Sequence, residues 1–320
     1  MPKLRRVVRA AGVITALACA ACTTTPGRTL LGTAARLGAS RPVITVGSFD
    51  FPESVLLAYL YADALAARGY PVRVLPDLGP RELVDAALMT GPIKLVPEYA
   101  GSALEFVSLD RQHATANEAA TTAALTRALA SRGIVGARPA AAQDANAVVV
   151  TATTAARFHL DSTSDLARVA RRLIFGGPPE CPERPYCLPG LRRVYGLRFR
   201  AFVALDAGGP LTRQALESGD IGAALLFTTD PDIRARHLVV LTDDRGLQPA
   251  ENVVPVLRRA TAERYGPGLL LALNAVSAHL TTAVLASLDA LVEIRGRAAK
   301  AVADSWLRSQ GLLARSGEGS

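Results

Sequence analysis

Short apolar runs alternate with amphipathic segments between residues 43 and 96, and this alternation constrains the fold of the chain most strongly. Three runs have the length and β-branched content of buried strands, namely 43–46, 72–75 and 93–96. The segments 53–68 and 81–90 have the apolar spacing of helices. This order predicts a parallel sheet, in which ligands bind beyond the carboxyl ends of the strands.

A second α/β unit begins near residue 146. Its predicted strands are 147–150, 173–175, 199–205, 221–227 and 237–241, and a further strand, 253–257, precedes a helical region from 268 to 310. Half of the residues are apolar, which is enough for one large core or two medium ones. The stretch 269–292 resembles a membrane span by composition, but Thr281 and Thr282 favour a new helix start, so we expect two packed helices.

The N-terminus has the pattern of an exported leader. Cationic residues precede a short apolar run, and Cys22 then opens a Thr-rich stretch. We predict a lipoprotein-type signal at 1–22 with Cys22 as the lipidated residue, followed by a flexible tether at 23–41. Cys19 is a second candidate for the processed cysteine, and a cleaved, soluble secretory protein is the alternative to an anchored one.

The net charge argues against a nucleic-acid partner. The formal charge of +8 falls to +4 without residues 1–21, because every charge in the leader is cationic. The remaining cations are mostly arginines interspersed with acidic residues, and they form no basic stripe beside stacking aromatic residues.

Cys181 and Cys187 lie close together in the second unit, separated by five residues. Neither His nor another Cys is nearby, so the pair lacks the ligands of a zinc site. In an exported chain the spacing predicts a disulfide that closes a small loop, and two free thiols are the alternative.

The sequence contains no nucleophile elbow, phosphate-binding loop, dinucleotide glycine pattern or zinc-protease motif, and its four histidines are scattered. We therefore predict no enzymatic activity, no metal site and no cofactor. Polar and aromatic residues instead follow the predicted strands, and two units with such loops predict a cleft that closes on a small molecule. These residues include Ser48, Phe49 and Ser54 after the first strand, Glu98, Tyr99 and Ser102 after the third, and Phe227 in the second unit.

Several sequence blocks, in order over about residues 42–311, resemble the glycine betaine/choline (osmoprotectant) substrate-binding proteins of ABC importers. The E-Y-x-G-S block at 98–102 and the D-D-x-G block at 243–246 are the most specific in combination. The others are S-x-x-x-x-E-S at 48–54, P-G-L at 189–191 with Y-G-L at 195–197, and F-T-T-D at 227–230.

The resemblance implies a two-lobed type II periplasmic-binding-protein fold of the α/β class. Each lobe would be a mostly parallel sheet flanked by helices, and two crossover strands, near Asn146 and 237–241, would join the lobes. Lobe 1 would comprise 42–145 and 242–311, lobe 2 would comprise 146–241, and 312–320 would form a tail.

The resemblance also implies that an aromatic cage holds the quaternary ammonium group of the ligand. Tyr99 keeps a cage position, whereas Asn146 and Phe227 stand where tyrosines are common and Glu251 falls on a third such position. Because these three positions lack the tyrosines of the family, the resemblance implies a site as poor in aromatic side chains as the chain itself, which has only 16. Glu251 would either pair with a cationic head or lie at the rim. The predicted ligand-binding residues are Ser48, Phe49, Ser54, Tyr99, Ser102, Asn146, Phe227 and Glu251.

The function implied is capture of a small cationic or zwitterionic osmolyte by hinge closure, for delivery to a permease and an ATPase. We expect a monomer outside the cytoplasm, attached to the outer face of the cell membrane by its lipid alone. The alternatives are an exported enzyme on the same scaffold, with Glu98 or Glu251 as general base, and an orphan sensor domain.

Overall fold

The structure is a computed structural model that describes residues 42–108 and 114–313. These residues belong to one compact unit, which spans 41–320. The predicted signal, the tether, Cys19, Cys22 and most of the predicted tail lie outside the described residues.

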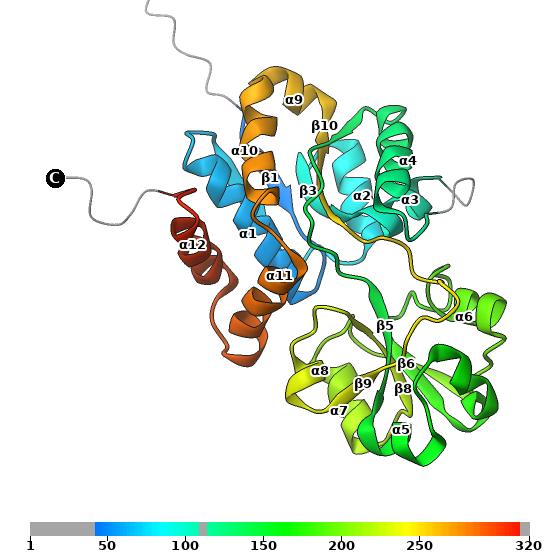
Figure 1. Cartoon of the computed structure of the whole chain (residues 1–320). Coiled ribbons are helices and arrows are strands. Elements are labelled where there is room, and N and C mark those ends of the chain that lie inside the picture. Colours follow the sequence, from blue (N-terminus) through cyan, green and yellow to red (C-terminus); the bar gives the residue numbers. More distant parts are fainter. Residues whose placement is uncertain (1–41, 109–113, 314–320) are drawn as a thin grey trace, which may run out of the picture. The chain divides into compact units, whose positions relative to one another are not determined.

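Lobe 1 is built around a sheet of five strands in the order β2-β1-β3-β10-β4, with helices on both faces (Figure 1). Strands β1, β2 and β3 are parallel, as the strand–helix pattern predicts, and β10 runs antiparallel to β3 and β4. The elements of lobe 1 are β1 (Ile44–Gly47), α1 (Pro52–Ala66), β2 (Val72–Leu75), α2 (Arg81–Thr90), β3 (Leu95–Tyr99), α3 (Ala100–Ser108), α4 (Glu118–Ala130), β4 (Ile134–Gly136), β10 (Val253–Arg258), α9 (Arg259–Tyr265), α10 (Pro267–Ser277), α11 (Thr282–Asp289), the π-helix η3 (Ala290–Ile294) and α12 (Ala299–Ser309).

Lobe 2 is built around a second sheet of five strands, in the order β7-β6-β8-β5-β9. Strand β6 is parallel to β7 and β8, and β5 is antiparallel to β8 and β9. The elements of lobe 2 are β5 (Asn146–Thr151), α5 (Ala152–Phe158), the 3₁₀ helices η1 (Thr163–Arg168) and η2 (Ala170–Arg172), β6 (Ile174–Gly177), α6 (Leu188–Tyr195), β7 (Ala201–Ala204), α7 (Pro210–Ser218), β8 (Ala223–Phe227), α8 (Asp232–Ala235) and β9 (Leu238–Val240).

Two chain segments connect the lobes, one between β4 and β5 and the other between β9 and β10. They lie side by side where Gln143 pairs with Asn252 as an isolated antiparallel bridge. The second crossover is expected near 237–241, but that stretch contains β9, an edge strand of the lobe 2 sheet. The crossing itself therefore lies further along the chain and includes Glu251.

Strand β3 extends further than its apolar run predicts, through Pro97 and Glu98 to Tyr99. The reason is tertiary, because β10 pairs with it in antiparallel register from Leu95 to Tyr99. As a result, Glu98 and Tyr99 lie at the carboxyl end of a buried strand and α3 begins directly after them.

The apolar C-terminal region forms two helices, as predicted. Thr281 caps α11 by accepting a hydrogen bond from the backbone N–H of Val284, and both α10 and α11 bury leucines in the core of lobe 1. Within the described ranges, no single helix is long and apolar enough to cross a membrane, and the pair Pro267–Ser277 and Thr282–Ile294 passes that test only together, bent by 80°.

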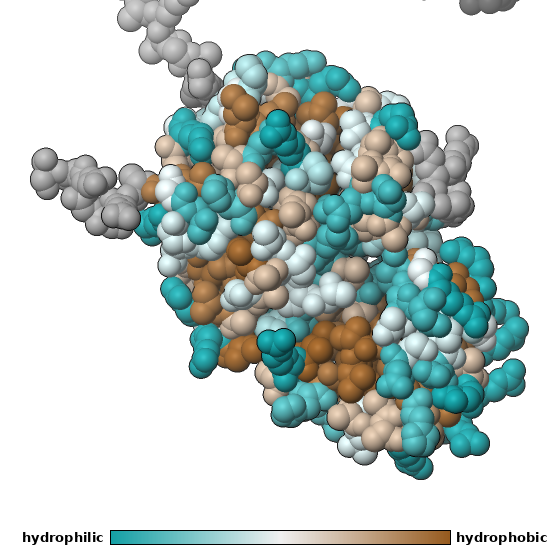
Figure 2. All heavy atoms as spheres, in the orientation of Figure 1, coloured by the Kyte–Doolittle hydropathy of each residue, from teal (hydrophilic) through white to brown (hydrophobic). Residues whose placement is uncertain are grey.

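The surface is mixed in character. Figure 2 shows hydrophilic side chains over much of lobe 2 around α5 and α6, and apolar side chains gathered at the lower centre of the view, near α8. Exposed large apolar residues include Leu211 at the start of α7 and Leu83 on α2. Most other large apolar side chains lie in the cores of the two lobes.

Candidate functional site

A pocket of about 330 Å³ lies between the lobes, beyond the carboxyl ends of β1, β3, β6 and β8. Both lobes and both crossing segments contribute side chains to it, as expected for a ligand site at the edge of two sheets. Its lining includes Phe49, Phe51, Arg81, Tyr99, Ser102, Glu105, Phe106, Asp144, Asn146, Arg184, Tyr186, Phe227 and Glu251.

Six of the eight predicted ligand-binding residues line this pocket, namely Phe49, Tyr99, Ser102, Asn146, Phe227 and Glu251. They come from the β1–α1 loop, the end of β3, the start of α3, the start of β5, the end of β8 and the second crossing segment. Residues that are up to 202 positions apart in the sequence are thus brought together, from Phe49 to Glu251.

Ser48 and Ser54 are fully buried and do not line the pocket. The hydroxyl of Ser48 donates to the carbonyl of Phe49 and accepts from the backbone N–H of Asp77, and the hydroxyl of Ser54 accepts from the N–H of Phe49. Both serines therefore hold the backbone of the loop that carries Phe49 into the pocket.

The site is not poor in aromatic residues, contrary to the expectation from the replaced cage positions. Six of the 16 aromatic residues of the chain line the pocket. Phe51 is at the centre, with ring-centroid distances of 5.9 Å to Phe49, 6.0 Å to Tyr99 and 5.4 Å to Phe227. The chain therefore concentrates its few aromatic side chains at the cleft.

Sequence reasoning missed three of these rings, Phe51, Phe106 and Tyr186. Phe51 was missed because it precedes Pro52, and the capping-box spacing of Asp50 and Glu53 makes this stretch resemble an ordinary helix start. In the structure Phe51 is the N-cap residue, without a side-chain cap, and Glu53 instead faces the other lobe. For Tyr186, the position between two cysteines was the one sequence feature that could have indicated a role in the pocket.

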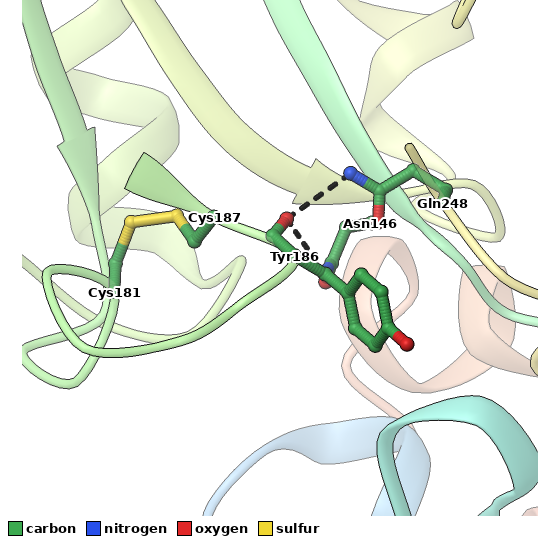
Figure 3. Close-up of a disulfide and its surroundings, with 5 residues drawn as sticks. All are labelled: Asn146, Cys181, Tyr186, Cys187 and Gln248. Carbon is green, nitrogen blue, oxygen red and sulfur yellow. Dashed lines mark hydrogen bonds between the residues drawn. A yellow bond between two sulfur atoms is a disulfide. The ribbon is translucent and has the colours of Figure 1, made fainter. Parts of the chain in front are cut away.

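Cys181 and Cys187 form the predicted disulfide, with Cα atoms 5.3 Å apart. The loop they close presents Tyr186 to the pocket, and its ring is directed away from the disulfide (Figure 3). The carbonyl oxygen of Tyr186 accepts hydrogen bonds from the side-chain amides of Asn146, at 3.5 Å, and Gln248, at 3.1 Å. Strand β5 and the second crossing segment thus fix the position of this loop.

The lobes contact each other on several sides of the pocket. The Tyr186 hydroxyl donates to Glu105 at 3.0 Å, and Arg184 pairs with Glu82 at 2.8 Å. At other contacts Thr229 donates to Glu53 at 2.7 Å and Arg213 pairs with Glu293 at 2.8 Å. The structure therefore has its cleft closed.

Three buried carboxylic acids meet where the lobes touch, namely Glu53, Asp144 and Asp289. Burial is the main reason that the pKa of Glu53 is raised. The pKa values of Asp144 and Asp289 are raised well above the usual range, by burial and then by the charge of Glu53. Tyr99 donates to Glu53 at 2.5 Å, so this cluster is linked directly to the pocket.

Glu251 is buried rather than at the rim, with 2% of its surface exposed. One carboxylate oxygen accepts from the backbone N–H groups of Gly101 and Ser102, both at 3.0 Å, and the other accepts from the Ser102 hydroxyl at 2.6 Å. Burial raises the pKa of Glu251 to about 7, while the bonds from Ser102 oppose that rise.

Gly101 makes this arrangement possible. A Cβ atom at this position would lie 2.4 Å from a side-chain carbon of Pro249 and 2.9 Å from the carbonyl oxygen of Ala250. Only glycine lets the start of α3 approach the crossing segment closely enough for Glu251 to reach its backbone N–H groups.

The arginine in the pocket is held by an acidic partner. Arg81 makes a two-pronged contact with Glu98, at 3.1 Å and 2.9 Å, and its guanidinium lies 4.9 Å from the centroid of the Phe49 ring. Glu98 is buried and does not line the pocket. Among the described residues, no group of three or more His, Cys, Asp or Glu side chains could hold a metal ion.

Comparisons with known proteins agree with this geometry. Residues 42–309 match the model of the substrate binding domain of ABC-type glycine betaine transport systems. The chain is 29% identical to a glycine-betaine-binding protein of Pseudomonas aeruginosa, over 86% of this chain and 90% of that one. It is also 28% identical to the glycine betaine-binding protein YehZ of Escherichia coli, over 86% of this chain and 92% of that one.

The fold is that of solved type II periplasmic-binding proteins. A crystal structure of a glycine betaine/carnitine/choline ABC transporter protein aligns with a TM-score of 0.67 at 20% identity, covering 84% of this chain and 99% of that one. The fold class predicted from sequence is therefore confirmed. The prediction of a binding protein rather than an enzyme is also confirmed, because the matching family is one of substrate-binding domains. The chain belongs to the family of substrate-binding domains of ABC-type glycine betaine transport systems.

Proposed function

We propose that, outside the cytoplasm, the interlobe pocket binds a small quaternary ammonium osmolyte of the glycine betaine and choline class and delivers it to a permease and an ATPase. The observation that carries this proposal is the concentration of six aromatic rings and several carboxylates from both lobes around one pocket. A quaternary ammonium group has no N–H donors, so it is recognised by the electron-rich faces of aromatic rings.

The size and the charge of the pocket agree with such a ligand. A volume of about 330 Å³ lies at the lower end of the range for small-molecule sites. The lining includes seven carboxylic acids, Asp50, Glu82, Glu105, Asp144, Glu180, Glu183 and Glu251, against two arginines. This imbalance favours a positively charged group inside the closed cleft.

Ligand capture proceeds by hinge closure in this proposal. Phe49, Phe51, Tyr99 and Glu251 come from lobe 1 and the crossing segment, whereas Phe227 and Tyr186 come from lobe 2. Neither half encloses the ligand alone. A ligand that touches both halves stabilises the closed form relative to the open one.

Calorimetric titration with glycine betaine, choline, carnitine and proline betaine tests the proposal. We expect at least one of them to bind, and Phe51→Ala to weaken that binding at least tenfold, since the central ring of the cluster is lost. Phe158→Ala is the matched control, because that ring belongs to lobe 2 and lies outside the pocket. Absence of binding for all four compounds would disprove the assignment.

Both residues that the alternative reading as an enzyme would use as general base already have partners within the chain. Glu98 pairs with Arg81 outside the pocket lining, and Glu251 accepts three hydrogen bonds from the start of α3. Three of the roughly four acceptor positions of the Glu251 carboxylate are therefore occupied by groups of this chain, which leaves one for a ligand donor.

We further propose that the protein is held to the membrane through a lipid on Cys22, on the basis of the leader pattern. Detergent phase separation of protein from expressing cells tests the anchor. Protein that partitions into the detergent phase, and moves to the aqueous phase after Cys22→Ser, supports it; wild-type protein in the aqueous phase contradicts it.

A further inference from the structure

We propose that this pocket selects a quaternary ammonium cation that carries a neutral hydroxyl group, as choline does, over a zwitterion that carries a carboxylate, and that Glu251 sets this preference. The inference rests on the proposed function and names the ligand class within it. It depends on which polar groups of the pocket already have hydrogen-bond or ion-pair partners within the chain.

The start of α3 is the natural place in this pocket for an anionic ligand group. Backbone N–H groups at a helix N-terminus have no partner within the helix, and the helix dipole favours a negative charge there. In this chain the carboxylate of Glu251 occupies that place, with Gly101 and Ser102 as donors at 3.0 Å. A ligand carboxylate would have to displace it or lie against it.

The Ser102 hydroxyl is also engaged. It donates to Glu251 at 2.6 Å. A hydroxyl has one proton to donate, so it has none left for a ligand carboxylate. Its lone pairs remain able to accept a proton from a ligand hydroxyl.

The two arginines of the pocket do not supply an alternative anion site. Arg81 gives two hydrogen bonds to the Glu98 carboxylate, and the face of its guanidinium lies over Phe49. Arg184 pairs with Glu82 and lies 5.8 Å from the centroid of Phe106. Each arginine is therefore balanced by an acidic partner, and a ligand carboxylate would compete with that partner.

A ligand hydroxyl meets suitable acceptors instead. Glu251 and Asp144 both line the pocket, and each has side-chain oxygens that accept hydrogen bonds. A hydroxyl can donate to such an oxygen, whereas two carboxylates in a closed, water-poor cleft repel each other. The aromatic cluster around Phe51 would hold the trimethylammonium end of either ligand equally.

Choline and glycine betaine test this directly, because they share the trimethylammonium group and differ in the hydroxyl or carboxylate at the other end. At pH 8.5 we expect calorimetry to show at least tenfold tighter binding of choline to the wild-type protein. Glu251→Gln should reduce the choline-to-betaine affinity ratio at least fivefold, because the amide removes the negative charge. Glu263→Gln removes one exposed charge of lobe 1 away from the pocket and should leave the ratio unchanged.

A second pair of ligands, longer by one methylene, requires no variant and remains informative if Glu251→Gln fails to fold. Homocholine should bind more tightly than the betaine of β-alanine. Equal or tighter binding of the carboxylates by the wild-type protein overturns the inference and leaves the proposed function intact. An unchanged ratio in folded Glu251→Gln overturns the role of Glu251. Failure of every quaternary ammonium compound to bind overturns both proposals.

Discussion

The hydroxyl of Tyr186 in lobe 2 donates a 3.0 Å hydrogen bond to the carboxylate of Glu105 on α3 of lobe 1. Tyr186 belongs to the loop that the disulfide closes, and Glu105 belongs to the helix whose first turn holds Glu251. This bond therefore joins the disulfide-closed loop of lobe 2 to the helix that forms the polar side of the pocket. Because it joins the two lobes, we expect it to break when the cleft opens.

We expect Tyr186→Phe to weaken ligand binding by about tenfold, because a hydrogen bond to a charged group is worth about 1.5–3 kcal/mol. The ring remains in the pocket, so the loss reports closure. Small-angle scattering of the ligand-free variant should show a larger radius of gyration than the wild type. Tyr195→Phe, whose hydroxyl bonds to Asp243 outside the pocket, serves as the control. Unchanged affinity in Tyr186→Phe would mean that this bond is not needed for the closed form.

Removal of the disulfide is expected to weaken binding and lower stability together. In the chain-entropy model, a loop as short as that between Cys181 and Cys187 contributes about 2 kcal/mol. The double variant Cys181→Ser, Cys187→Ser also loses the restraint on Arg184 and Tyr186, both of which contact lobe 1.

Thermal unfolding and ligand titration of the double variant, compared with the wild type under non-reducing conditions, provide the measurement. Reducing agent added to the wild type should reproduce the variant. A variant that loses stability but keeps full affinity would show that the loop holds its shape without the bond.

Tyr99→Phe separates the two roles of Tyr99. Its hydroxyl donates to the buried Glu53 carboxylate, whereas its ring lies in the aromatic cluster. Loss of the hydroxyl leaves a buried acceptor short of a donor, which costs about 1–3 kcal/mol. We therefore expect a lower unfolding free energy with a smaller loss of affinity, and Tyr99→Ala to lose both. Equal affinity losses in the two variants would contradict the cage role of the ring.

The buried acids between the lobes predict that stability falls as pH rises. The pKa values of Glu53, Asp144 and Asp289 are raised in the folded state. Above about pH 4 the folded protein therefore binds more protons than the unfolded protein. Their contribution to stability is therefore greatest at acidic pH and is lost as pH rises toward the raised pKa values.

Asp289→Asn removes one of these acids outside the pocket lining and should raise the unfolding free energy at pH 8 by about 1–3 kcal/mol, with little change at pH 4. Glu217→Gln, an exposed carboxylate, should leave the pH dependence as in the wild type. Denaturant melts at the two pH values make the comparison, and a pH-independent effect of Asp289→Asn would contradict it.

Affinity for a cationic ligand should rise with pH. The pKa of Glu251 is raised to about 7, chiefly by burial and with a further rise from the charge of Glu98, while Ser102 and Arg81 act in the opposite direction. Ionisation of Glu251 across neutral pH adds a negative charge beside the ligand, so we expect choline to bind about tenfold more tightly at pH 8 than at pH 6.

Calorimetric titrations of the wild type and Glu251→Gln at both pH values test this expectation. The affinity of the variant should depend less steeply on pH. We assign the slope that remains to Asp144, which also lines the pocket and also has a raised pKa. The same slope in both proteins would rule out Glu251 as the titrating group.

The strand and helix pattern was predictable because it depends on local spacing. The parallel arrangement of β1, β2 and β3 follows from the short helices between them, and the bounds of β2 and α2 are those predicted. The end of β3 was not predictable, because its last residues are held by β10, more than 150 residues later in the chain.

The site was predictable only in part, for the same reason. Tyr99 and Phe227 could be singled out because sequence blocks and strand ends mark them, and Glu251 because it falls on a cage position of the family. Nothing local distinguishes Phe51 from a helix-start residue or Phe106 from a core residue. Ser48 and Ser54 follow the right strand, yet their hydroxyls bond to the loop backbone beneath Phe49.

The sequence by itself therefore determined the class of fold, the disulfide and the residue types available to a quaternary ammonium site. The tertiary structure decided which of those residues meet and which of their polar groups remain available. Glu251 shows the physical reason, because its partners at Gly101 and Ser102 are about 150 residues away and depend on a glycine that lets two segments approach. Tertiary packing decides which residues form hydrogen bonds over such separations in the sequence, so a local sequence pattern cannot predict these bonds.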